Sequence, residues 1–289
     1  MSESVARPIF VIGTARSGTT WLANILISHP AIAGVAAAEH QGIHESHLFS
    51  HTRYVLDGMR PVAEFLEKYS REDYFKLLGI EAGLLRCKEE KVDVFRFFRL
   101  LMEEYSRRRS AQYWLEKTPK HAIYYREIVK EFPDAFFVII RRRFDETLLS
   151  NLNKYARPGS TKWRQIIEKL FRYVSDMRSI LKLENCAPEK TVTVSYEALL
   201  LNYDREISRI LDFLGLEKMH LESAYAADSS FKGGNRYNFA ITRTDWLLIR
   251  LLKYVCEFVP FSLMYRLRVQ RDMAETNVFP KFDLIKTAP

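Results

Sequence analysis

The sequence has little cysteine and no long uncharged apolar run. Its three cysteines, Cys87, Cys186 and Cys256, are far apart and lack C-x-x-C spacing, so they predict neither a disulfide framework nor a zinc site. The first residues are polar, without the apolar stretch that a secretory signal peptide needs. These shortages favour a protein of a reducing compartment, and we expect a cytoplasmic location.

One segment is more apolar than the rest. Residues 246–264 read WLLIRLLKYVCEFVPFSLM, with charges at Arg250, Lys253 and Glu257. No stretch in it reaches the roughly 18 uncharged residues of a membrane-spanning helix. The spacing predicts a helix over 245–258 with its charges on one narrow stripe. Two interpretations stay open: a core helix, or a helix that makes peripheral contact with a membrane or an apolar acceptor.

The charge balance is basic. The 44 Lys and Arg residues exceed the 36 Asp and Glu residues, which gives a net charge of +8. This balance favours an anionic partner, or it reflects a solvated basic surface. The arginine clusters at 106–110 and 141–143 are separate, and the second follows an apolar segment that reads as a buried strand. A nucleic-acid interface needs grouped basic and aromatic side chains, so we expect no nucleic-acid partner.

Strand and helix signals alternate along the chain. Short apolar or β-branched runs predict strands at 8–13, 112–117, 135–141 and 191–196. Helical periodicity covers 18–28, 61–109 in pieces, 119–132, 145–154, 161–183 and 203–216. This alternation predicts an α/β fold, with a central parallel sheet flanked by helices.

No repeat or Gly/Ser linker divides the chain, so we expect a single domain over 1–289. We expect four parts within it. Residues 8–60 would hold a ligand-binding loop and a candidate base, 61–110 a helical insertion, 111–216 the rest of the sheet, and 217–289 a loop and apolar helices.

The segment FVIGTARSGTTWL at 10–22 is typical of a phosphate-binding loop that joins a strand to a helix. Gly13 and Gly18 have the spacing of G-x-x-x-x-G-K-[ST], but Thr19 stands where the lysine belongs and Arg16 lies inside the loop. Backbone N–H groups and the positive end of a helix dipole favour an anion at such a turn. The following residues are the candidate donors: Arg16, Ser17, Gly18, Thr19 and Thr20.

A nucleoside triphosphate with magnesium fits this loop poorly. The lysine that would bridge two phosphates is missing, and the strand at 135–141 ends in arginine instead of an acidic residue. An anion neutralised by arginine fits better. A P-loop kinase or another nucleotide-binding protein stays open as the alternative.

Two motifs in this order resemble the sulfotransferases that use 3′-phosphoadenosine 5′-phosphosulfate (PAPS). RSGTTWL at 16–22 is similar to their 5′-phosphosulfate loop, and RRFDETLLS at 142–150 is similar to their 3′-phosphate element. WLEKTPKH at 114–121 and the segment 194–216 resemble the family more diffusely. The resemblance implies a P-loop-like fold, PAPS as co-substrate, no metal, and a hydroxyl acceptor that is a carbohydrate, a lipid or a small molecule.

The resemblance also implies roles for individual residues. Arg142 and Ser150 would bind the 3′-phosphate, and Tyr196 would lie near the nucleotide. The full set of implied cofactor-binding residues is Arg16, Ser17, Gly18, Thr19, Thr20, Trp21, Arg142, Ser150, Tyr196, Lys232 and Arg236. The last two lie in FKGGNRYN, which is equally typical of a solvated glycine turn.

The acceptor hydroxyl needs a base, and three residues are candidates. Arg16 would stabilise the leaving phosphate by its charge, while Glu39, His40 or His121 would take the proton. A histidine is the easier base at neutral pH, because Glu39 would need burial to raise its pKa. The histidines between residues 40 and 51 lack a metal-ligand pattern, so we expect no metal site.

Overall fold

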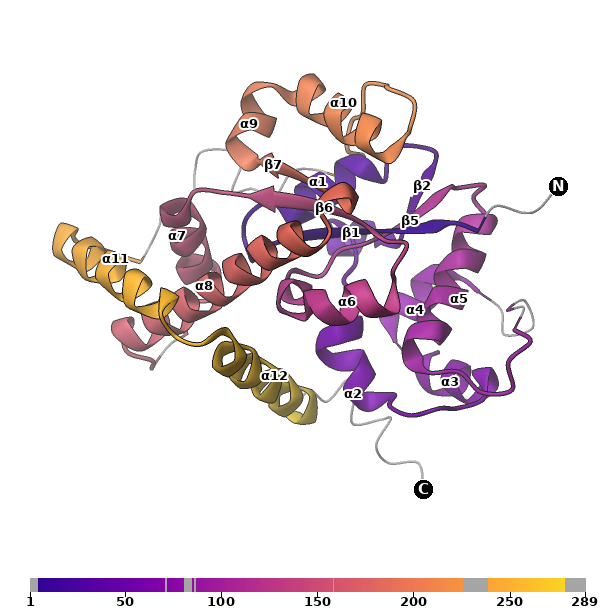
Figure 1. Ribbon diagram of the computed structural model, residues 1–289, viewed down its shortest axis with the longest axis horizontal. Helices are drawn as coiled ribbons and strands as arrows, with labels where there is room; N and C mark the ends of the chain where they lie inside the picture. The colour runs from indigo at the N-terminus through magenta and orange to yellow at the C-terminus, as the bar shows by residue number, and fades with distance from the viewer. Residues whose placement is uncertain are drawn as a thin grey trace.

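A parallel five-stranded sheet crosses the middle of the molecule (Figure 1). Its spatial order is β2 (Ile32–Gly34), β5 (Tyr113–Glu116), β1 (Arg7–Gly13), β6 (Phe136–Arg141) and β7 (Thr191–Ser195). A short antiparallel pair, β3 (Ala36–Ala37) and β4 (Gly42–Ile43), follows the edge strand β2. The structure is a computed structural model that describes residues 5–70, 72–80, 85, 87–157, 159–225 and 239–278.

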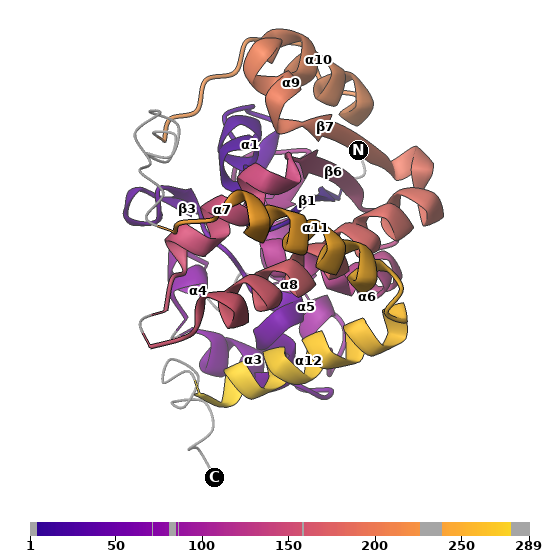
Figure 2. The same ribbon diagram turned by 90° about the vertical axis from the view of Figure 1, so that its left-hand side faces the viewer.

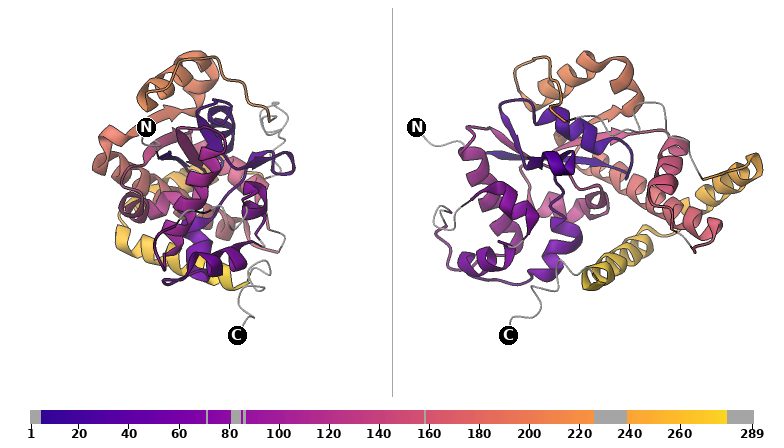
Figure 3. Two further views of the ribbon diagram at one scale, coloured as in Figure 1. Left: turned by 90° about the vertical axis from the view of Figure 1, so that its right-hand side faces the viewer. Right: turned by 180° about the vertical axis from the view of Figure 1, so that it is seen from behind.

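Helices cover both faces of this sheet. They are α1 (Thr19–Leu26), η1 (Ala38–His40), η2 (Leu48–Thr52), α2 (Arg53–Val55), α3 (Val62–Tyr69), α4 (Asp73–Leu78), α5 (Val94–Arg107), η4 (Pro119–Tyr124), α6 (Tyr125–Glu131), α7 (Phe144–Lys154), α8 (Lys162–Cys186), η5 (Pro188–Lys190), α9 (Tyr196–Leu201), α10 (Tyr203–Leu214), α11 (Arg243–Glu257) and α12 (Phe261–Val278). The helices α9 and α10 lie on one side of the sheet, and α3 to α5 lie on the other (Figure 3, left).

The central strand β1 shows how the two cores form. Its side chains alternate between the faces, as a strand requires. Ile9 and Val11 pack with the apolar faces of α1 and α10, whereas Phe10 and Ile12 pack with α5, α6 and the end of α8. All four are buried to within 1% of complete. A strand buried on both faces reads as a continuous apolar run, which is why it was readable from the sequence.

The expected α/β class, with a P-loop-like parallel sheet in a single domain, is confirmed. Two details differ from the expectation. The helix expected over 119–132 begins as the 3₁₀ turn η4, with Pro119 in its first turn, where the missing N–H is tolerated, and becomes α-helical only at Tyr125. The edge strand β2 was missed, because three residues are too short to show a period.

The two C-terminal helices lie along the outside of the molecule. Figure 2 shows α11 in front of α8 and α12 along the lower edge of the molecule. Arg268 of α12 forms a buried ion pair with Asp176 of α8 at 2.8 Å, and Phe261 and Tyr265 pack against the core. None of the described helices is both long and apolar enough to cross a bilayer.

Candidate active site

Two glycines hold the loop between β1 and α1 in place. Gly18 has a φ of 102°, and a Cβ there would lie 2.7 Å from Cδ2 of Tyr196. A Cβ on Gly13 would lie 2.8 Å from the carbonyl oxygen of Ile140. Larger residues are therefore excluded at both positions. Since Gly18 caps α1 without a side-chain hydrogen bond, the first N–H groups of the helix remain for a ligand.

The loop is tied to helix α7. Arg16 Nε donates to Ser150 Oγ at 3.1 Å, and Asn151 Nδ2 donates to the carbonyl oxygen of Ala15 at 2.7 Å. Arg142, which follows β6, reaches the carbonyl oxygen of Arg16 at 3.4 Å. Residues far apart in the sequence thus form one cluster of two guanidinium groups and a hydroxyl.

Only Arg142 of the three consecutive arginines lines the cavity described below. Its guanidinium lies 4.4 Å from the centre of the Tyr196 ring, which Trp21 meets edge-on at 5.6 Å. Arg141 instead pairs with Glu184 of α8, and Arg143 is exposed beside Asp145. The stack on Tyr196 fixes the plane of the Arg142 fork.

Several buried polar atoms near the loop lack a hydrogen-bond partner among the described residues. They are Ser17 Oγ, Arg142 Nε and Thr147 Oγ1. Such atoms are rare in folded proteins because leaving them unpaired costs free energy. Other such atoms, among them Ser106 Oγ, Trp114 Nε1 and Arg172 Nε, belong to other parts of the described chain, so these three atoms do not by themselves mark a ligand site.

A cavity of about 390 Å³ opens beside the loop. Its walls are formed by Ala15, Arg16, Gly18, Thr19, Thr20, Trp21, Asn24, His40, Gln41, Ile43, His44, Glu45, His47, Lys117, Pro119, Arg142, Lys154, Tyr155 and Tyr196. We call the side that carries Arg16, Arg142 and Tyr196 the loop wall. The side that carries Glu45, His47 and Lys117 is the carboxylate wall.

The carboxylate wall is built around a charge pair. Lys117, whose side chain is 2% exposed, donates from Nζ to Glu45 Oε1 at 2.7 Å, and His47 Nε2 lies 3.6 Å from Glu45 Oε2. Burial by itself would raise the pKa of Glu45, but Lys117 and His47 hold that pKa below its usual value. Burial lowers the pKa of His47 to about 4. At neutral pH this wall therefore presents a carboxylate and an uncharged imidazole.

The model of the sulfotransferase family matches residues 8–220, which is most of the chain. The chain belongs to the sulfotransferase family. In fold it is similar to a sulfotransferase domain from the curacin biosynthetic pathway, with 15% identity, a TM-score of 0.50, and coverage of 95% of this chain and 99% of that one. It is also similar to sulfotransferase STF1 from Mycobacterium tuberculosis, with 17% identity, a TM-score of 0.51, and coverage of 88% and 77%. No curated protein matches the sequence significantly.

The three expected bases of this sulfotransferase lie in different surroundings. Glu39 is exposed and does not line the cavity, whereas His40 is exposed at its rim and stacks on His44 at 4.0 Å. His121 is fully buried outside the cavity lining. Its Nδ1 lies 2.8 Å from Glu116, and its Nε2 accepts from the N–H of Phe49 at 3.2 Å. Lys232 and Arg236 lie outside the described residues.

Sequence reasoning missed Glu45, His47 and Lys117 of the sulfotransferase. Glu45 and His47 stand within the quoted histidine-rich stretch, and Lys117 is the lysine of EKTP. The signal that could have found them is the position of EKTP at the carboxyl end of a predicted strand. In a parallel sheet that end lies beside the ends of its neighbours, so Lys117 had to lie near the phosphate-binding loop.

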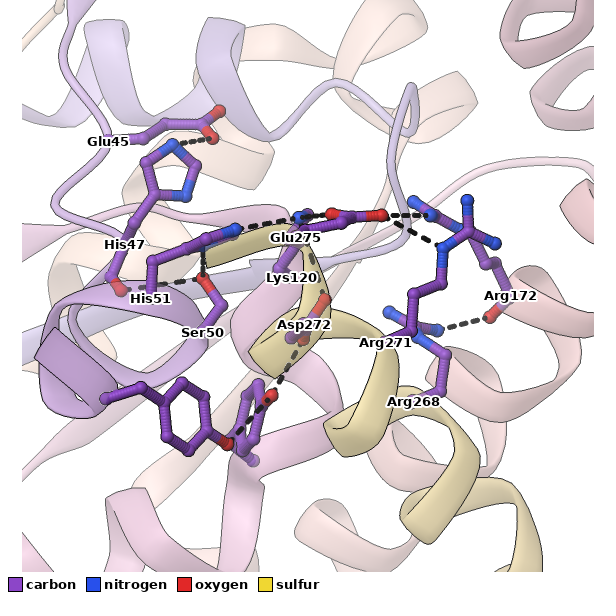
Figure 4. Close-up of polar contacts among 12 residues, drawn as sticks. Glu45, His47, Ser50, His51, Lys120, Arg172, Arg268, Arg271, Asp272 and Glu275 are labelled. Carbon is purple, nitrogen blue, oxygen red and sulfur yellow. Dashed lines mark hydrogen bonds and ion pairs between the residues drawn. The ribbon is translucent and has the colours of Figure 1, made fainter. Parts of the chain in front are cut away.

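A polar network supports the carboxylate wall from behind (Figure 4). Ser50 joins the carbonyl of His47 to His51, and Lys120 reaches His51 Nε2 at 3.4 Å and Glu275 of α12 at 2.6 Å. Burial lowers the pKa of His51 to about 3, so its ring accepts a hydrogen bond from the Lys120 ammonium. Helix α12 thus helps to place the turn that carries His47.

Within the described parts of the chain, no group of three or more His, Cys, Asp or Glu side chains is arranged to hold a metal ion. The four histidines between residues 40 and 51 instead form two ring pairs. His40 stacks on His44, and His47 meets His51 edge-on at 5.2 Å.

Proposed function

We propose that this sulfotransferase moves the sulfuryl group of PAPS to a hydroxyl of a carbohydrate, lipid or small-molecule acceptor by in-line transfer. One observation carries the proposal: a single cavity is lined by two arginines and two threonines on the loop wall and by a carboxylate paired with a buried lysine on the carboxylate wall. The first wall suits a donor with several negative charges, and the second suits a hydroxyl that must lose its proton.

The loop wall offers ligands for a 3′,5′-bisphosphate. Arg142 and Ser150 are assigned to the 3′-phosphate, because a planar fork and a hydroxyl match its oxygens. The hydroxyl of Ser150 can accept from Arg16 and still donate to a phosphate oxygen. Ser17, Thr19 and Thr20 with their N–H groups are assigned to the 5′ side. Trp21 and Tyr196 offer apolar surface beside them.

When bound, PAPS would supply a sulfuryl group on a good phosphate leaving group. Arg16 then has two tasks. Its fixed positive charge would stabilise the negative charge that grows on the leaving oxygen, and its bond to Ser150 orients the side chain. It would not act as a proton donor, because a guanidinium does not deprotonate near neutral pH.

We assign the role of base to Glu45. It lines the same cavity as Arg16 and Arg142 and is ionised at neutral pH, although the lysine contact that lowers its pKa also makes it a weaker base than a carboxylate without that contact. Lys117 fixes one carboxylate oxygen, and the neutral ring of His47 flanks the other. An ionised carboxylate has about four lone-pair sites on its two oxygens, so Glu45 can keep these contacts and still accept a hydrogen bond from the acceptor hydroxyl. Glu39 and His40 stay alternatives for the base, and the transfer assay described below, applied to variants of each residue, distinguishes them.

The alternative of a P-loop kinase has less support. The loop carries Thr19 at the position of the phosphate-bridging lysine, and Lys117, the buried lysine of the cavity, is engaged by Glu45. Membership of the sulfotransferase family points the same way.

A transfer assay tests the proposal. Labelled PAPS is incubated with panels of alcohols, phenols, glycans and lipids in the presence of EDTA, and label in the acceptor is measured. In parallel, calorimetry compares adenosine 3′,5′-bisphosphate (PAP) with AMP. We expect transfer to at least one class and tighter binding of PAP. Equal binding of PAP and AMP would contradict the donor assignment, and ATP-dependent phosphorylation that EDTA abolishes would favour the kinase.

A further inference from the structure

Helix α11 turns its apolar face toward solvent. Six large apolar side chains on it and at its C-terminal end are 45–69% exposed: Leu247, Leu248, Leu251, Tyr254, Val255 and Phe258. Four of them follow the spacing i, i+4, i+7 and i+11, which places them on one side of the helix. We call these six residues the α11 apolar face. Patches of this kind mark interaction sites, since a surface helix normally turns polar residues outward.

The opposite side of α11 already has its core contacts. Ile249 is completely buried against Leu148 and Leu152 of α7 and Ile166 of α8. Leu252 packs in a neighbouring cluster with Leu170 of α8. The expectation of a core helix therefore holds for this side alone. The exposed side is additional apolar surface that the rest of the described chain does not bury.

The charges beside the α11 apolar face are unbalanced. Both acidic residues of the helix are neutralised by lysines, because Asp245 pairs with Lys162 and Glu257 pairs with Lys253, each at 2.5 Å. Its two arginines, Arg243 and Arg250, are exposed, and no described carboxylate forms an ion pair with either. The face is therefore apolar with an excess of positive charge at its edge.

We propose that the α11 apolar face docks on the surface of an anionic lipid bilayer. The leucine and aromatic side chains would enter the headgroup region, and Arg243 and Arg250 would meet lipid phosphates. A lateral helix with large apolar side chains on one side and flanking cations is the usual form of such a contact. Aromatic residues such as Tyr254 and Phe258, which pack at 4.9 Å, suit this boundary because they tolerate both environments.

Charge complementarity distinguishes this partner from a second copy of the chain. In a two-fold dimer the same face meets itself, so the unpaired arginines of the two copies would come close together. Each copy also carries a net charge of +8. An anionic bilayer supplies the negative charge that a second copy lacks. The docking does not depend on the transfer reaction, so it is tested without it.

Vesicle flotation with the full chain tests the docking. The probes are vesicles of phosphatidylcholine alone and of phosphatidylcholine with 30% phosphatidylglycerol. The main variant carries Leu247→Gln, Leu251→Gln and Phe258→Gln, which removes apolar surface without changing charge. A second variant carries Arg243→Gln and Arg250→Gln. The matched control is Leu201→Gln on α9, because Leu201 is 82% exposed on another part of the surface.

We expect the wild type and the Leu201 variant to float with the anionic vesicles. The triple variant should bind at least about tenfold more weakly, since each lost apolar side chain removes a share of buried surface. The arginine variant should lose much of the preference for anionic over neutral vesicles. Absence of wild-type flotation, or equal binding by the triple variant, would overturn the proposal. So would a dimer in light scattering that the triple variant dissociates, because the face would then cover a second copy.

Discussion

The two walls of the cavity hold their charges in different ways. On the loop wall, Arg16 and Arg142 contact a hydroxyl, a carbonyl oxygen and an aromatic ring, and Glu146 meets Arg142 at 3.4 Å from a partly exposed position. On the carboxylate wall, a buried lysine is joined to Glu45 at 2.7 Å. The first arrangement places two guanidinium groups beside one partly exposed carboxylate, whereas the second joins one lysine directly to one carboxylate.

This difference predicts different consequences of mutation. Removal of a loop-wall cation should either weaken binding of the anionic donor or slow the transfer step by destabilising the transition state. Removal of a carboxylate-wall group should leave donor binding intact and affect the acceptor step. The predictions below test that separation, beginning with the largest effect.

The replacement Glu45→Gln should cause the largest loss. It keeps the shape of the side chain but removes the proton acceptor, so turnover should fall by about 10² to 10⁴-fold. PAP affinity, measured by calorimetry, should stay within about twofold, because no assigned donor contact is lost. The matched control is Glu39→Gln, which changes an exposed side chain outside the cavity lining. If Glu39→Gln were the damaging change, the base would belong to that residue.

The replacement Arg16→Ala should reduce turnover by about 10² to 10³-fold, because it removes a charge placed to stabilise the leaving group. Arg16→Lys restores the charge but not the planar fork, and it should recover part of the rate. The assay is single-turnover transfer of labelled PAPS to the best acceptor. An unchanged rate for Arg16→Ala would show that Arg16 does not stabilise the leaving group.

The replacement Arg142→Ala should act on binding. Loss of a charged hydrogen-bonding group should weaken PAP by roughly 10 to 100-fold. Affinity for AMP should change little, because AMP lacks the 3′-phosphate. Arg143→Ala is the control, since that neighbouring arginine is exposed beside Asp145. Equal losses for PAP and AMP would show that Arg142 does not discriminate the 3′-phosphate.

The smallest effect concerns stability and pH. The pKa values of His47 and His51 are lowered to about 4 and about 3 in the folded chain, from about 6.5 in the unfolded chain. As pH falls below about 6.5, the unfolded state binds protons that the folded state does not. The free energy of unfolding should therefore decrease between pH 7 and pH 5.

Urea unfolding at pH 7, 6 and 5 measures this slope. The variant His51→Gln should show a shallower slope than the wild type. The exposed His220 has a raised pKa beside Asp204, so His220→Gln should shift the slope in the opposite direction. Identical slopes for all three proteins would contradict the burial of His51 as the cause.

The fold and the loop wall could be predicted because their signals are local. The strand β1 is an unbroken apolar run, and the glycine spacing after it marks the turn. Arg142 and Ser150 are eight residues apart on one strand-to-helix unit. Their positions relative to each other therefore do not depend on how the other strands of the sheet are arranged. Their direct contact with Arg16 could only be inferred through the resemblance.

The carboxylate wall could not be predicted because it is assembled by contacts between distant segments. Glu45 and Lys117 are 72 residues apart, and they meet because the segment after β4 lies beside the end of β5. Glu39 had the same residue type and was closer to the loop in sequence. Only the position of each carboxylate relative to the cavity distinguishes them. His121 is a second example. Its two ring nitrogens contact Glu116 and the N–H of Phe49, and these contacts could not be read from the sequence.

The sequence by itself determined the α/β class, the glycine-bearing turn between β1 and α1, and the placement of Arg142 and Ser150 on one strand-to-helix unit, because each depends on residues within one or two adjoining elements. The tertiary structure decided which carboxylate faces the cavity, which arginine of residues 141–143 lies there, and which side of α11 meets solvent. The physical reason is that burial and electrostatic pairing depend on neighbours in space. Those neighbours come from segments whose order along the chain does not reveal their contacts.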